Sequence, residues 1–230
     1  MAYTLYIGNK NYSTWSLRGW LVTRASGAPF SEKLVSLNAN EHAGVYQEFS
    51  PSGLVPCLVD GQTTVWDSLA ITEYLHERHP GLWPAEATAR AWARSICAEM
   101  HSGFRTLRGE MGMCIRERVD VRPWSPALAR DIERITAIWN ETLKRHGADG
   151  GKGGLLFGSF CAADAFFGPV AFRFRTYGVE PDGAAGKYLS ALLAHPYMQE
   201  WERAALAETE IVEADEPRII YGDRIGRAKA

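Results

Sequence analysis

The chain has 230 residues, of which 46% are hydrophobic and 23% are charged, and its formal net charge at pH 7 is -2. This length is enough for one large domain or two small ones with a sizeable core. The near-neutral charge gives no electrostatic reason to expect nucleic acid or a membrane surface as partner, so we expect a small molecule or a second copy of the chain.

Two features that the sequence lacks bear on where the protein is located and on whether it binds a metal. No apolar run long enough to cross a bilayer and no signal-peptide pattern occur, so a cytoplasmic location is expected. The four cysteines lie far apart and form no CxxC pair, namely Cys57, Cys97, Cys114 and Cys161. Their spacing indicates neither a disulfide framework nor a zinc site, and no metal is expected.

The first third of the chain alternates short apolar runs with helical patterns, as in an α/β domain. The patterns predict strands over 3–7 and 30–37, a hairpin over 57–66 that turns at Asp60-Gly61, and helices over 14–25, 41–49 and 68–79. The remainder has a different character, because no convincing strand recurs after residue 86. Helices are predicted there over 87–119, 126–146, 161–177, 187–194 and 196–206. We therefore expect an N-terminal domain over 1–82 and an all-helical domain over 86–230.

The segment Val55-Pro56 opens a predicted strand, where the proline removes one ladder hydrogen bond. A cis peptide bond here would turn the Val55 amide and carbonyl outward, ready to pair with an extended peptide. An ordinary trans proline at an edge strand is the alternative.

Asp67 and Ser68 stand at the start of the predicted helix 68–79. A helix N-terminus attracts a carboxylate, a serine adds a donor, and an aspartate can pair with an ammonium group. Together they suit a zwitterionic amino acid, although simple N-capping is the more common explanation for such residues.

The loop over residues 9–14 joins the first strand to the first helix. Its amides and hydroxyls at a helix start would stabilise an anion such as a thiolate, and they also suit a capping loop. Three separate segments thus converge on one possible site.

The chain resembles the glutathione transferase superfamily in three segments with the family's spacing: 50–56, which ends at Pro56, 67–71 with Asp67-Ser68, and 157–164, which ends at Asp164. The segments 9–18 and 99–104 also resemble a bacterial subgroup with serine at the catalytic position. The resemblance implies a thioredoxin-like N-terminal domain that binds glutathione, and an all-α domain that shapes the pocket for a second substrate.

Carried over to this sequence, the resemblance implies specific contacts with glutathione. Val55, beside a cis Pro56, would pair with the cysteinyl part, while Asp67 and Ser68 would hold the γ-glutamyl end. Ser13 is our choice for the hydroxyl that binds the sulfur, with four rivals in the same loop and helix start: Asn11, Tyr12, Thr14 and Ser16. Three residues are candidates for the glycine carboxylate: Lys10, Asn40 and His42.

The expected function is that of a glutathione transferase-like enzyme, with glutathione as co-substrate, no metal, and a small hydrophobic electrophile or peroxide as second substrate. A glutathione-dependent isomerase of the maleylacetoacetate isomerase kind is an alternative. A binding module that has lost catalysis is another. The resemblance also implies a homodimer.

Overall fold

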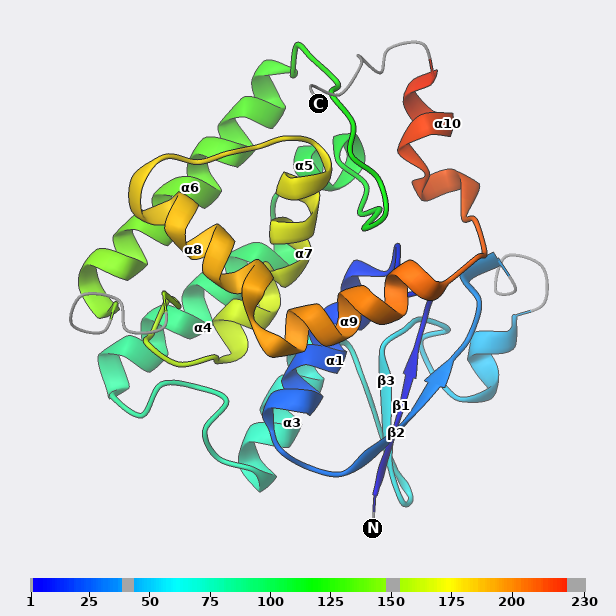
Figure 1. Ribbon diagram of the computed structural model, residues 1–230. Helices are drawn as coiled ribbons and strands as arrows, with labels where there is room; N and C mark the ends of the chain where they lie inside the picture. Colours follow the sequence, from blue (N-terminus) through cyan, green and yellow to red (C-terminus); the bar gives the residue numbers. More distant parts are fainter. Residues whose placement is uncertain (1, 39–43, 148–153, 223–230) are drawn as a thin grey trace.

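The structure is a computed structural model that describes residues 2–38, 44–147 and 154–222. One mixed sheet has the strand order β2-β1-β3-β4 (Figure 1), formed by β1 (Tyr3–Ile7), β2 (Phe30–Leu34), β3 (Cys57–Asp60) and β4 (Thr63–Trp66). β1 and β2 are parallel, whereas β1 with β3 and β3 with β4 are antiparallel. Along β1 the buried residues alternate, and Tyr3, Leu5 and Ile7 belong to the core.

Two helices of the N-terminal part, α1 (Thr14–Ala25) and α3 (Ser68–Arg78), pack against each other beside the sheet. The remaining helices, which make up the helical region, are α4 (Ala87–Ser102), α5 (Arg105–Glu110), α6 (Pro126–His146), α7 (Ala162–Thr176), α8 (Gly183–Ala194), α9 (Pro196–Ala207) and α10 (Pro217–Tyr221), and the 3-10 turns are η1 (Val45–Glu48) and η2 (Glu213–Asp215). Of these helices, α4 to α8 lie on the side of α1 away from the sheet, while α9 runs beside α1 and α10 stands apart from them (Figure 1). α7 is buried along nearly its whole length and contacts α1, α4 and α8. One continuous apolar core therefore joins both parts.

The architecture confirms the predicted fold class, an α/β N-terminal part followed by a helical region. The first strand, the hairpin and the helices over 14–25, 68–79 and 126–146 lie where the patterns predict them. The strand predicted over 30–37 ends at Leu34, because the chain leaves the sheet and the Leu37 amide bonds the Asn9 side chain at 2.8 Å. Of the helix predicted over 41–49, the described part contains only η1.

The prediction of one helix over 87–119 is wrong. The helix breaks at Phe104, whose φ of 59° is left-handed, and after α5 the chain runs without further helix to α6. The Arg173 guanidinium from α7 donates to the Met111 carbonyl, which a continuing helix would have used. The helix predicted from residue 187 begins earlier, at Gly183, and neither η2 nor α10 was predicted.

Candidate functional site

A cavity of about 410 Å³ opens where α1, the loop before β3, the end of β4 and the start of α3 meet. Its lining residues are Trp15, Ser52, Leu54, Val55, Pro56, Trp66, Asp67 and Ser68. Two of the three segments singled out in the sequence thus contribute to one cavity. The loop over residues 9–14 does not line it, although the next residue, Trp15 on the first turn of α1, does. We call this cavity the cleft.

The Val55–Pro56 peptide bond, on the loop before β3, is cis. Among the described residues, no partner binds the Val55 amide or carbonyl, since the β3 ladder begins at Cys57. Pro56 packs directly on α1, where a Cβ added to Gly19 would lie 2.7 Å from the Pro56 Cγ. A glycine at position 19 is therefore what lets the proline and the Val55 backbone approach α1 this closely.

Asp67 and Ser68 lie at the start of α3, as predicted. Asp67 caps the helix, accepting from the Leu69 amide at 2.7 Å, and its φ of 72° is unusual for a residue other than glycine. Such strained backbone concentrates at functional sites. The Ser68 hydroxyl lines the cleft, is 1% exposed and has no hydrogen-bond partner among the described residues. An acceptor on a bound molecule would satisfy it.

A histidine from the helical region completes this end of the cleft. The Nε2 atom of His101, on α4, lies 3.2 Å from Oδ2 of Asp67, and its ring meets the Trp15 ring edge-on at 5.2 Å. Burial lowers the pKa of His101. The negative charge of Asp67 opposes this shift, and the positive charges of Arg18 and Arg108 reinforce it. The sequence analysis gave His101 no role, because only the fold brings residue 101 to residue 67.

Ser13 is the N-cap of α1 and does not itself line the cleft. Its Oγ donates to the Ser16 Oγ at 2.8 Å and accepts from the Ser16 amide at 3.3 Å, while the Gly8 amide donates to the Ser16 Oγ at 2.9 Å. Ser13 and Ser16 thus share one buried hydroxyl pair at the positive end of α1. Thr14, the first residue of α1, is buried beside them.

Two of the rivals of Ser13 are held by residues that follow α5. The Asn11 side chain bonds the Cys114 thiol and the Arg116 amide, and the Tyr12 hydroxyl donates to Glu216 at 2.8 Å. The Glu208 carboxylate accepts the amides of Lys10 and Asn11 at 2.7 and 3.0 Å. These contacts fix the loop before Ser13 and engage the polar groups of Asn11 and Tyr12.

The structure does not bring Lys10 into the cleft. Its Nζ lies 2.8 Å from the Glu32 carboxylate and over the rings of Trp20 and Trp201, and it lines a separate depression beside α9. The pairing with Glu32 explains why this lysine is buried. Asn40 and His42 lie outside the described residues.

The sequence analysis also missed Arg18, a cation buried behind Trp15. It is 1% exposed, its guanidinium lies 4.6 Å from the Trp15 ring, and its Nε and Nη1 have no hydrogen-bond partner in the described parts of the chain. Burial lowers its pKa, and the neighbouring Arg108 and Arg173 lower it further. An arginine within the otherwise apolar run of α1 is the signal that could have drawn attention to it.

Three further features of the described residues bear on function: the cysteines, possible metal ligands and possible membrane-spanning helices. All four cysteines are buried free thiols, and burial raises the pKa of Cys57, Cys97, Cys114 and Cys161. Across the described ranges, no group of three or more His, Cys, Asp or Glu side chains is placed to hold a metal ion. In those ranges there is also no helix with the length and apolar character needed to span a membrane.

Comparison with known proteins adds three findings. Residues 12–78 match the family model of the glutathione S-transferase N-terminal domain. A solved glutathione transferase homologue from Burkholderia GL BGR1, with bound glutathione, superposes with a TM-score of 0.66 at 24% identity, over 90% of this chain and 99% of that one. A stringent starvation protein A homologue from Haemophilus ducreyi is 22% identical over 182 residues, 78% of this chain and 79% of the relative.

A shorter stretch is more similar. A probable maleylacetoacetate isomerase from Caenorhabditis elegans is 38% identical over 103 residues, which are 42% of this chain and 48% of that protein. Residues 12–78 are therefore identified as a glutathione S-transferase N-terminal domain, and the chain has the fold of the glutathione transferases.

Proposed function

We propose that the chain is a glutathione-dependent enzyme that binds glutathione in the cleft and directs its sulfur at a small hydrophobic electrophile or peroxide. The observation that supports this most is that Val55, whose backbone has no hydrogen-bond partner among the described residues, lines one cavity together with Asp67 and Ser68. In this proposal residues 1–82 form the glutathione-binding domain and residues 86–230 shape the second-substrate pocket. A homodimer and a cytoplasmic location belong to the same proposal.

Glutathione would lie extended, its cysteinyl backbone paired with the amide and carbonyl of Val55 as an added strand. Its γ-glutamyl carboxylate would accept from the Ser68 hydroxyl at the positive end of α3, which has no partner in the described part of the chain, and its ammonium group would face Asp67. One Asp67 oxygen caps α3 and the other faces His101, so the carboxylate is already oriented before the ligand arrives. Asn40 and His42 stay candidates for the glycine carboxylate, whereas Lys10 is better explained by its pairing with Glu32.

Ser13 would then stabilise the thiolate. A thiol with a pKa near 8.5 is only about 3% ionised at pH 7, and lowering that pKa by about 2 units requires roughly 2.7 kcal/mol. One hydroxyl donating to a charged sulfur contributes about 1.5–3 kcal/mol, and the helix N-terminus adds about 0.3–1. Rotation of the Ser13 hydroxyl toward the sulfur leaves Ser16 paired, because its Oγ still accepts the Gly8 amide. The reaction then depends on holding the thiolate beside the electrophile.

Two alternatives have support of their own. The 38% identity with a probable maleylacetoacetate isomerase favours a glutathione-dependent isomerisation over the matched stretch. The engagement of the Ser13 hydroxyl with Ser16, outside the cleft lining, favours a module that binds glutathione without activating it. A substrate panel run with glutathione separates conjugation, peroxide reduction and isomerisation from the absence of catalysis.

Binding itself is tested by calorimetric titration of glutathione into the wild type, Asp67→Asn and Asp60→Asn. The first substitution keeps a capping oxygen but removes the charge that faces the ammonium, and we expect affinity to fall about tenfold. Asp60 ends β3 and bonds Tyr74, outside the cleft, so its variant serves as the matched control. Absence of binding to the folded wild type at millimolar glutathione would refute the proposal.

A further inference from the structure

The loop that leads to Ser13 is a tight turn. The Asn9 carbonyl accepts from the Ser13 amide at 2.8 Å and from the Tyr12 amide at 3.2 Å. The amides of the two residues inside the turn, Lys10 and Asn11, take no part in these bonds and need acceptors from elsewhere. Since Ser13 both ends the turn and caps α1, the place of its hydroxyl depends on how the turn is held.

One carboxylate that follows α9 supplies both acceptors. Oε1 of Glu208 accepts from the Lys10 amide at 2.7 Å, and Oε2 accepts from the Asn11 amide at 3.0 Å. Hydrogen bonds to an ionised acceptor are about twice as strong as neutral ones. Just before Glu208, the buried Trp201 of α9 donates from its Nε1 to the Lys10 carbonyl at 2.9 Å. The backbone of the turn is therefore fastened to α9 and to the residue that ends it.

Two further glutamates hold side chains of the same turn. Glu210 accepts from the Asn9 Nδ2 at 2.9 Å, and Glu216, which is 7% exposed, accepts from the Tyr12 hydroxyl at 2.8 Å. Three carboxylates between α9 and α10 thus bind one short loop, and Glu208 is the one that binds its backbone.

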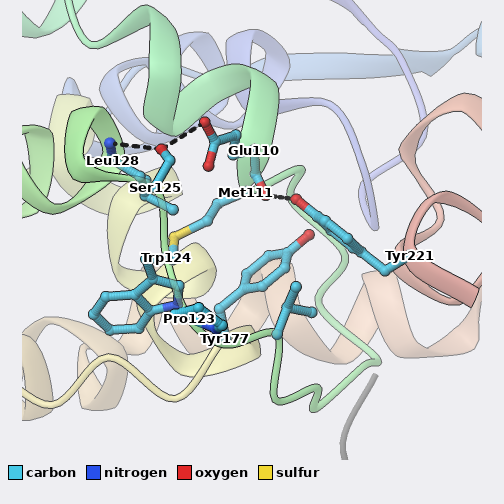
Figure 2. A pocket seen from close by; sticks show the side chains of 9 residues that line it. Glu110, Met111, Pro123, Trp124, Ser125, Leu128, Tyr177 and Tyr221 are labelled. Atoms are coloured by element: carbon cyan, nitrogen blue, oxygen red, sulfur yellow. Dashed lines mark hydrogen bonds between the residues drawn. The ribbon is translucent and has the colours of Figure 1, made fainter. Parts of the chain in front are cut away.

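The segment that carries these glutamates is anchored on both sides. On one side, α9 packs against α1. On the other, Glu216 directly precedes α10, and Figure 2 shows Tyr221 of that helix reaching the end of α5. There the Tyr221 hydroxyl donates to the Glu110 carbonyl, and its ring meets the Tyr177 ring edge-on at 6.3 Å. The glutamates are therefore firm supports for the turn before Ser13.

The negative charge of Glu208 has positive neighbours. Burial raises the pKa of Glu208, whereas its bonds to the two amides and the charges of Lys10 and Arg116 lower it. Arg116 itself donates to the Tyr12 hydroxyl at 3.1 Å and to the Glu210 carbonyl at 2.9 Å. Because these cations offset the carboxylate nearby, we expect its hydrogen bonds, more than its charge, to affect a thiolate at the start of α1.

We propose that Glu208 is a positioning residue for thiolate formation: it holds the turn that places the Ser13 hydroxyl beside the sulfur of bound glutathione. This inference rests on the function proposed above and gives the role of Ser13 a structural basis. Glutathione affinity should not depend on Glu208, because Val55, Asp67 and Ser68 lie on other elements.

The test replaces Glu208 with glutamine, which has the same shape but only one acceptor oxygen for two amides. In Glu208→Gln the pKa of the bound glutathione thiol, followed by thiolate absorbance, should rise by about 0.5–1, while the Kd of glutathione stays within about twofold. Glu208→Asp, which keeps two charged oxygens, should fall between this variant and the wild type. Glu200→Gln is the matched control, since Glu200 lies on α9 but pairs with the exposed Arg24 at 3.1 Å.

A double variant shows whether the effect runs through Ser13. Ser13→Ala alone should raise the thiol pKa, and adding Glu208→Gln should raise it no further. Additive shifts would overturn the proposal, as would an unchanged thiol pKa in Glu208→Gln. A lower thiol pKa in that variant would also overturn it, because the charge of Glu208 would then act directly on the thiolate.

A measurement without glutathione separates this inference from the proposed function. In the ligand-free protein, NMR-detected hydrogen exchange of the Lys10 and Asn11 amides should be about tenfold faster in Glu208→Gln than in the wild type or in Glu200→Gln. Thermal melting confirms that each variant folds. Equal exchange would overturn the role of Glu208 even where glutathione binds, whereas faster exchange in a protein that binds no glutathione would refute the proposed function and the role of Glu208 with it.

Discussion

Asp67 and His101 meet at 3.2 Å, although the first begins α3 and the second ends α4. This contact ties the helical region to the cleft. Burial lowers the pKa of His101, and the fold places its Nε2 atom against Oδ2 of the Asp67 carboxylate. The histidine thus orients the acid that would face the γ-glutamyl ammonium.

Replacing this histidine should therefore weaken glutathione binding without unfolding the protein. For His101→Ala we expect an affinity about three- to tenfold lower, because the Asp67 carboxylate loses the polar contact with His101 that holds it in place. Calorimetric titration measures the change, and His76→Ala, on α3 but outside the cleft lining, is the control. Equal affinity in His101→Ala and the wild type would remove His101 from the site.

The contact between Gly19 and Pro56 predicts a second effect. In Gly19→Ala the new methyl group would lie 2.7 Å from the Pro56 Cγ, so the loop that carries Val55 must move. We expect a loss of about 1–3 kcal/mol in the free energy of unfolding, together with weaker glutathione binding.

Gly109→Ala is the matched control for this substitution. Gly109 lies within α5, and an added Cβ there meets nothing within 4 Å. Alanine should be neutral or stabilising by up to about 1 kcal/mol. Urea unfolding measures both variants, and equal stabilities would show that Pro56 does not depend on the glycine.

Ser13→Ala tests thiolate stabilisation. If the hydroxyl donates to the sulfur, its removal should raise the pKa of bound glutathione and lower kcat by about 10- to 100-fold, with little change in affinity. A pH titration of thiolate absorbance in the complex measures the pKa. Ser26→Ala, at the opposite end of α1, should leave it unchanged. Identical titration curves for Ser13→Ala and the wild type would exclude Ser13 from this role.

Asp164 gives the fold a defined pH dependence. Burial raises the pKa of this carboxyl from 3.8 to about 6, against the opposing effect of its bonds to the Cys161 and Leu156 amides. A raised pKa in the folded state means that stability is fully present below pH 3.8 and is lost as pH rises through about 6. The difference between the two pKa values corresponds to about 3 kcal/mol.

Comparison of the wild type with Asp164→Asn isolates this contribution. The difference in free energy of unfolding between the two proteins should shift by about 2 kcal/mol between pH 4 and pH 7, with the wild type relatively more stable at the acidic end. Urea titrations at several pH values provide the measurement. A difference that does not vary with pH would show that Asp164 titrates normally in the folded protein.

Much of the N-terminal part could be predicted from the sequence, because its signals are local. The Asp60-Gly61 turn defines the hairpin, and Ser13 and Asp67 both cap the helices that the patterns place after them. The pairing of Lys10 with Glu32 could not be predicted, since it depends on how β2 lies beside the loop after β1.

The helical region was harder to predict, because its helix boundaries also depend on contacts between residues far apart in the sequence. Residues 87–119 have helical periodicity throughout, but Arg173, far along the chain, takes carbonyls that a longer helix would need. Likewise, Glu208 and Glu216 hold the loop before Ser13 only because the chain returns to it after α9. Tertiary contacts override local preference in both cases.

A crystal structure of the protein grown with glutathione tests the central claim most directly. The account predicts that the tripeptide lies along the loop before β3, with its cysteinyl backbone paired to Val55, its γ-glutamyl end at Asp67 and Ser68, and its sulfur toward the N-terminus of α1. Density for glutathione elsewhere, or an empty cleft at saturating concentration, would contradict it.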